Sequence, residues 1–148
     1  MYKHILLPTD GSELAMKGLE QGLALAKALK ASATIATVTP EWSAYEMAIE
    51  AQAGRSNPIE RFEKETATTA QRILNAAKRK AEAAGVDVDT VHMAERHAAE
   101  GIIEAATERG CDLIVMSSHG RRGVRRIVLG SQAAEVVTNT TIPVLIIR

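Results

Sequence analysis

The sequence is poor in several features that would indicate a particular class of protein. It has one cysteine, Cys111, which excludes an internal disulfide and a cysteine-based zinc cluster. Aromatic residues make up only 3% of the chain, so the core must be built mainly from Ile, Leu, Val and Ala. Lysine and arginine number 18, as do aspartate and glutamate. The resulting net charge of zero gives no electrostatic reason to expect nucleic acid or an anionic membrane as a partner.

Long apolar runs are absent as well. None approaches the roughly 20 residues that a membrane-spanning helix needs. The opening residues lead straight into a short apolar run and lack the layout of a signal peptide. Cys111 stands beside an apolar run and is predicted to be a buried, inert thiol. Together these observations favour a cytoplasmic protein.

What the chain does contain is an alternation of short apolar runs and amphipathic stretches. Its 148 residues predict a single domain, residues 1–148. The alternation predicts an α/β fold with a parallel sheet and helices on both faces, although periodicity leaves the strand order open. The predicted strands are residues 5–7, 33–38, 86–93, 112–116 and 144–147, and the predicted helices are a Ser12-capped helix to residue 30 and residues 59–84, 98–109 and 132–139.

Residues 41–58 fit the alternation poorly. They contain Trp42, Tyr45, Gly54 and Pro58, and predict a connection with a helical turn near residues 44–52. Two interpretations stay open at this point. The segment could be a loop that covers the edge of the core, which we favour, or a lid over a ligand.

One stretch has the layout of a phosphate-binding loop. It runs Ser117, Ser118, His119 and Gly120, then nine residues, then Gly130 and Ser131. An apolar run precedes it, and a helix with Ser131 as its N-cap is predicted to follow. Glycine allows the backbone to approach an anion, and the first N–H groups of a helix lack intrahelical partners. The helix dipole also favours a negative group there.

The spacing of this stretch resembles the nucleotide-binding signature of the universal stress protein family. Gly120, Gly130 and Ser131 match that signature, and Ser117 stands where the family has its first glycine. The opening stretch His4-Ile-Leu-Leu-Pro-Thr-Asp-Gly-Ser12 and the closing stretch Ile142-Pro-Val-Leu-Ile-Ile147 also resemble the family. The resemblance therefore covers essentially the whole chain.

The resemblance implies a five-stranded parallel sheet in the order 3-2-1-4-5, with ATP bound at the carboxyl ends of strands one and four. It implies that Asp10 holds the ribose, that the backbone at Val38 receives adenine, and that Mg or Mn is carried on the phosphates. It also implies a homodimer paired through the last strand, Ile142 to Ile147. The positions expected to bind the cofactor are Pro8, Thr9, Asp10, Val38, Met116, Ser117, His119, Gly120, Arg121, Gly130, Ser131 and Gln132.

Three of these positions keep alternatives open. Asp10 could simply bond the N–H groups of Gly11 and Ser12 in a turn. His119 could contact phosphate or brace the loop by bonding its backbone, and we favour the brace. Ser117 would cost affinity if its backbone had a positive φ, whereas with a negative φ its hydroxyl could donate to the ligand.

No constellation in the sequence assigns a catalytic role. Arg121, Arg122, Arg125 and Arg126 favour phosphate contact or a solvated surface, because no aromatic residues interleave them for stacking on bases. Neither a nucleophile elbow nor a Walker lysine is present. We therefore expect a nucleotide-binding protein of the stress response. The alternatives are an interaction protein of the same fold with a vestigial pocket, and a weak ATPase.

Overall fold

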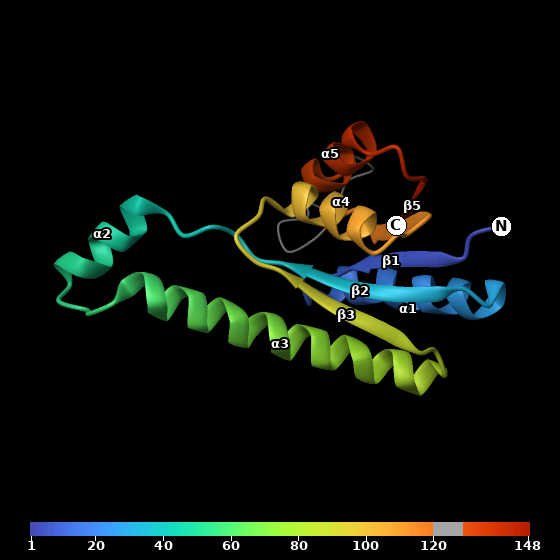
Figure 1. Cartoon of the computed structure of the whole chain (residues 1–148), viewed down its shortest axis with the longest axis horizontal. Coiled ribbons are helices and arrows are strands. Elements are labelled where there is room, and N and C mark those ends of the chain that lie inside the picture. Colours follow the sequence, from blue (N-terminus) through green and yellow to red (C-terminus); the bar gives the residue numbers. More distant parts are fainter. Residues whose placement is uncertain (120–128) are drawn as a thin grey trace.

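The computed structural model describes residues 1–119 and 129–148. Strands and helices follow one another along the chain as predicted (Figure 1). The strands are β1 (His4–Pro8), β2 (Ser32–Val38), β3 (Val88–Met93), β4 (Leu113–Ser117) and β5 (Val144–Ile147). The helices are α1 (Glu13–Leu29), α2 (Ala44–Gln52), α3 (Pro58–Ala84), α4 (Ala98–Glu108) and α5 (Ser131–Asn139).

The strands form one parallel sheet in the order β3-β2-β1-β4-β5. This confirms both the fold class and the strand order that the family resemblance implied. The order reverses between β1 and β4, and both strands end at the same edge of the sheet. In open α/β sheets, ligands bind beyond the carboxyl ends of the strands at such a reversal.

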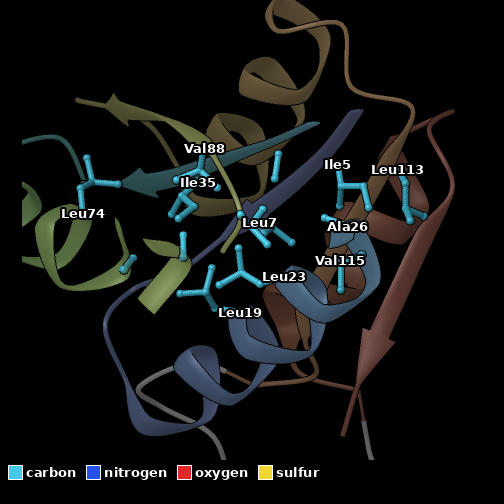
Figure 2. Close-up of a cluster of buried hydrophobic side chains, with 14 residues drawn as sticks. Ile5, Leu7, Leu19, Leu23, Ala26, Ile35, Leu74, Val88, Leu113 and Val115 are labelled. Carbon is cyan, nitrogen blue, oxygen red and sulfur yellow. The ribbon is translucent and has the colours of Figure 1, made fainter. Parts of the chain in front are cut away.

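Two aliphatic clusters cover the two faces of the sheet. Alternate residues of each strand point to opposite faces, so Ile5 and Leu7 pack toward α1 and α3, while Leu6 packs toward α4 and α5. Figure 2 shows the first cluster, in which leucines of α1 meet branched side chains of the sheet. Cys111 lies in the second cluster, and burial raises the pKa of its thiol to about 11. The predicted burial of this cysteine is therefore confirmed, and the raised pKa disfavours the reactive thiolate.

Helix α1 lies very close to the sheet because it carries glycine where it crosses the strands. A Cβ placed on Gly22 would overlap the Leu7 side chain and lie 3.4 Å from the Cγ1 atom of Val115. A Cβ on Gly18 would lie 3.1 Å from the backbone N of Ser117. These two small residues let α1 rest on the ends of β1 and β4, where the predicted site lies.

Replacing Gly22 by valine should therefore destabilise the fold. The extra methyl groups would have to displace the buried Leu7 side chain, which costs about 1–3 kcal/mol for an overpacked core. Chemical denaturation should show this loss in the free energy of unfolding. Ala24→Val is the matched control, since residue 24 lies on the exposed face of the same helix. Equal stability of the two variants would contradict this packing.

Residues 41–58 differ from the favoured interpretation. The helical turn predicted near residues 44–52 is confirmed as α2, whose N-cap is Ser43, but the contacts of α2 are mainly with α3. Figure 1 shows α2 and the start of α3 projecting together beyond the carboxyl edge of the sheet. Trp42 and Tyr45 remain exposed there.

Within the two described ranges, no helix is both long and apolar enough to cross a membrane.

Candidate functional site

The site is the carboxyl edge of β1 and β4. These neighbouring strands pair Ile5 with Leu113 and Leu6 with Ile114. The turn that follows β1 and the loop that follows β4 therefore leave the sheet side by side. Three described segments converge here, namely residues 8–12, residues 117–119 and the start of α5.

The loop after β4 is closed at its base by a backbone hydrogen bond. Gly130 N–H donates to the Ser118 carbonyl at 2.9 Å. A Cβ on Gly130 would lie 2.5 Å from that carbonyl oxygen and 3.2 Å from the Cδ2 atom of His119. Gly130 has an ordinary φ of −61°, so glycine is needed here for close approach of two chain segments and not for backbone freedom.

The prediction that Ser131 caps α5 is wrong. Gly130 is the N-cap and Ser131 is the first helical residue, because the bond to Ser118 holds Gly130 extended at the helix entrance. Glycine has no side chain that could accept a hydrogen bond, so the N-cap residue of α5 provides no side-chain cap. The first N–H groups of the helix therefore keep their positive potential toward the edge of the sheet. That is the property expected of an anion-binding helix terminus.

Gln132 is oriented away from this potential site. Its Oε1 atom accepts a hydrogen bond from the backbone N–H of Ala99, the second residue of α4, at 3.1 Å. The side chain thus fastens α5 to α4. The group of Gln132 that could bind an anion is therefore its backbone N–H, which lies in the first turn of α5.

Ser117 is accommodated without backbone strain. It is the last residue of β4 and only 8% exposed. Among the described non-glycine residues, positive φ angles occur only at Lys30, Asn57 and Glu95, so the cost considered for a left-handed serine does not arise. Its hydroxyl donates to the His119 carbonyl at 2.8 Å, and Gly18 of α1 leaves room for its Cβ.

Among the described residues the His119 ring bonds the neighbouring side chain of Ser118, whereas we favoured a bond to the loop backbone, most of which lies outside those residues. Its Nδ1 atom lies 3.1 Å from the Ser118 hydroxyl, and these two groups share a hydrogen bond. Ser118 therefore makes two bonds: its carbonyl accepts from Gly130 N–H, and its hydroxyl bonds the His119 ring. Gly120 and Arg121, together with Arg122, Arg125 and Arg126, lie outside the described residues.

Asp10 stabilises the turn after β1. Its Oδ1 atom accepts from Ser12 N–H at 2.9 Å, as one of the two interpretations predicted. Gly11 N–H donates to the Thr9 hydroxyl at 3.2 Å and not to Asp10. An ionised carboxylate accepts several hydrogen bonds, so this turn contact is compatible with binding a sugar hydroxyl.

Pro8, Val38 and Met116 lie at or near the carboxyl ends of β1, β2 and β4, and the side chains of Val38 and Met116 pack in the second cluster. Pro8 ends β1 opposite Ala36, and Met116 is buried in the second cluster. The Val38 side chain packs on α4, where a Cβ on Gly101 would lie 2.6 Å from its Cγ1 atom. The Val38 side chain is therefore engaged by α4, and its backbone is the part that continues along the edge.

A separate groove between α4 and α5 is unsuited to phosphate. It has a volume of about 680 Å³, and glutamates dominate its lining. Arg96, the one cation among the described residues of the lining, is held by Glu104 at 2.7 Å. Such a surface repels a polyphosphate, which leaves the edge of β1 and β4 as the candidate nucleotide site.

The sequence profile described as "Universal stress protein family" matches residues 1–148. The chain belongs to the universal stress protein family. Universal stress protein MJ0531 of Methanocaldococcus jannaschii is 34% identical over 148 residues, which cover 100% of this chain and 83% of that protein. The solved structure of MJ0577, from the same organism, has a TM-score of 0.77 at 28% identity, covering 99% of this chain and 96% of that one.

Two other structures of universal stress proteins were determined with adenine nucleotides. One, in complex with cAMP, has a TM-score of 0.68 at 24% identity and covers 99% of this chain and 97% of its own. The other, from Archaeoglobus fulgidus in complex with dAMP, has a TM-score of 0.72 at 19% identity and covers 99% and 98%. At identities below 25%, these two structures show only that they share the fold of this chain.

Sequence reasoning missed a set of buried hydroxyls behind the site of this universal stress protein. The Thr37 hydroxyl donates to the Thr9 carbonyl at 2.8 Å, and Thr39 shares a hydrogen bond of 2.7 Å with Nε2 of His92. Burial lowers the pKa of His92, which favours its neutral form in this pair. The signal available in the sequence was the pair of threonines, Thr37 and Thr39, at the end of the predicted strand 33–38.

Proposed function

We propose that this chain binds ATP at the carboxyl ends of β1 and β4 and acts in the stress response through its bound state. The observation that carries the proposal is the N-terminus of α5. Its N-cap residue, Gly130, supplies no side-chain cap, and the Gly130 N–H donates to the Ser118 carbonyl just after β4. A helix terminus in this position offers N–H groups and a favourable dipole to phosphate.

In this proposal each of the three segments at the carboxyl edge binds a different part of the nucleotide. The phosphates lie at the backbone of Gly130, Ser131 and Gln132, opposite Ser117 and His119, with Gly120 and Arg121 completing the loop. The β1 turn, from Pro8 to Asp10, faces the ribose. The backbone of Val38 and Met116 lies beside the base and the sugar.

A divalent cation in this arrangement would be coordinated by the phosphates of the nucleotide and not by protein side chains. Within residues 1–119 and 129–148, no group of three or more His, Cys, Asp or Glu residues could hold a metal. Mg or Mn would then be bound mainly by phosphate oxygens and water, as is common for Mg in nucleotide sites. A Cβ on Gly130 would meet the Ser118 carbonyl oxygen and the His119 ring, so the lack of a side chain at this position suits the close approach of a phosphate group.

The choice of an adenine nucleotide draws on relatives. Structures with the same fold contain cAMP and dAMP, which share the adenine ring and one phosphate with ATP. We further propose that the protein forms homodimers through β5 and acts in the cytoplasm.

We infer binding and not dedicated hydrolysis. Efficient hydrolysis needs a water activated by a general base, and no pattern in the sequence assigns one. Equilibrium dialysis of radiolabelled ATP against nucleotide-free protein tests binding itself. Steady-state phosphate release then separates a binding protein from a weak ATPase.

The role of Asp10 leads to a prediction. If its carboxylate holds the ribose, Asp10→Ala should weaken ATP binding by about 1.5–3 kcal/mol, the range for hydrogen bonds to a charged group. Inorganic tripolyphosphate, which lacks the sugar, should bind with unchanged affinity. Titration calorimetry measures both.

The matched variant Asp10→Asn keeps an acceptor for Ser12 N–H and removes only the charge. It should preserve the turn and lose part of the ATP affinity. Equal losses for ATP and tripolyphosphate would instead assign Asp10 to a metal-binding or purely structural role.

A further inference from the structure

The ladder between β1 and β2 ends earlier than the ladder between β2 and β3. On the β1 side, the last rung is the bond from Thr9 N–H to the Ala36 carbonyl, at 2.9 Å. On the β3 side, Thr39 N–H still donates to the Met93 carbonyl at 2.9 Å, and Arg96 N–H donates to the Thr39 carbonyl at 3.1 Å. The end of β2 therefore extends past β1 while β3 continues to hold it in place.

Val38 lies in this overhang, and its backbone faces β1. Successive residues of a strand direct their N–H and C=O groups to opposite neighbours. Because Ala36 bonds to β1 and Thr39 bonds to β3, the N–H and C=O of Val38 point to the β1 side. In a continued parallel ladder, the acceptor for Val38 N–H would be the Thr9 carbonyl. No backbone hydrogen bond joins these two described residues.

The Thr9 carbonyl accepts a hydrogen bond from the Thr37 hydroxyl instead, at 2.8 Å. Thr37 points to the same face of the sheet as Ile35, since side chains two apart on a strand share a face. Its hydroxyl therefore approaches the Thr9 carbonyl from that face of the sheet and not along the ladder. Thr37 is only 2% exposed, so water cannot easily replace either partner.

We propose that Thr37 is a positioning residue for the nucleotide base. Its hydroxyl ends the β1–β2 ladder one rung early and so leaves the Val38 N–H and C=O directed into the site, as a donor and an acceptor for a base edge. The inference rests on the proposed nucleotide site. It adds the side chain that shapes the base end of that site without touching the ligand.

The test removes the hydroxyl and keeps the shape. In Thr37→Val the Thr9 carbonyl is free to accept Val38 N–H, so amide hydrogen exchange at Val38, followed by NMR in the nucleotide-free protein, should slow by about tenfold or more. ATP affinity should fall by about tenfold, the effect of losing one ordinary hydrogen bond. Affinity for inorganic tripolyphosphate should stay unchanged.

Two further variants separate positioning from general damage. Thr37→Ser keeps the hydroxyl and should behave as the unmodified protein. Thr34→Val removes another fully buried hydroxyl of β2, one that bonds the His4 Nε2 atom at 2.8 Å at the far end of the strand. It should alter neither Val38 exchange nor the affinity for ATP.

Unchanged Val38 exchange in Thr37→Val would overturn the inference, as would equal losses of ATP and tripolyphosphate affinity. Failure of the unmodified protein to bind ATP would count against the proposed function. The exchange comparison, which uses no nucleotide, would then still decide whether Thr37 ends the ladder.

Discussion

Gly130→Val should abolish measurable ATP binding while the protein remains folded. The smallest side-chain carbon at this position already meets the Ser118 carbonyl oxygen at 2.5 Å, and valine adds two methyl groups. The entrance to α5 and the end of β4 would have to separate. The helix N–H groups would then leave the place where the phosphates are proposed to lie. Loss of two or more charge-assisted hydrogen bonds of about 1.5–3 kcal/mol each corresponds to at least a hundredfold weaker binding.

The substitution must be compared with an equally drastic change elsewhere. Gly54→Val is the matched control, since Gly54 follows α2 and nothing lies within 4 Å of its Cβ position. Its φ of +76° makes valine strained there, so the control also loses stability. Thermal melts establish that both variants fold, and calorimetry compares their ATP affinities. Unchanged affinity in a folded Gly130→Val protein would remove α5 from the proposed site.

Leu145→Lys should convert the proposed homodimer into monomers. β5 is at the edge of the sheet and pairs with β4 along one side. It is apolar throughout, with no lysine or inward charge to discourage pairing with another chain. Two antiparallel copies of β5 related by a twofold axis would bury each other's edges. Leu145 is 41% exposed, so its replacement leaves the core intact.

The expected effect is large because a twofold interface contains every substitution twice. Two lysines in place of two leucines should weaken association by about 2–4 kcal/mol, or roughly 30- to 1000-fold. Val137→Lys, an exposed apolar position on α5, is the matched control and should remain dimeric. Ile146 is a poor choice, because it packs on the second cluster. Sedimentation that finds the unmodified protein monomeric at tens of micromolar would remove the dimer.

The sequence predicted the elements of the fold well, because each carries its own pattern. The apolar run before Ser117 and the stripe from Ala15 to Leu29 identify a strand and a helix with little dependence on the rest of the chain. The order of the strands depends on contacts between residues far apart in the sequence. It came from the family resemblance and not from any local pattern.

Local preference failed where tertiary contacts decide the structure. Serine is a favoured N-cap, yet α5 begins at Ser131 because Gly130 is bonded to Ser118. The positive-φ strain considered for Ser117 is absent because the serine is the last residue of a strand. Its hydroxyl donates a hydrogen bond to the His119 carbonyl. The bond from Thr37 to Thr9 joins residues 28 apart, and no periodicity could reveal it.

Titration of nucleotide-free protein with ATP, followed by the backbone amide signals in NMR, tests the central claim most directly. We predict saturable binding, with the largest shifts at residues 9–11, 38, 117–119 and 130–132. Residues around the glutamate-lined groove of α4 and α5 should be unaffected. Absence of saturable binding, or shifts centred away from the carboxyl ends of β1 and β4, would contradict the account.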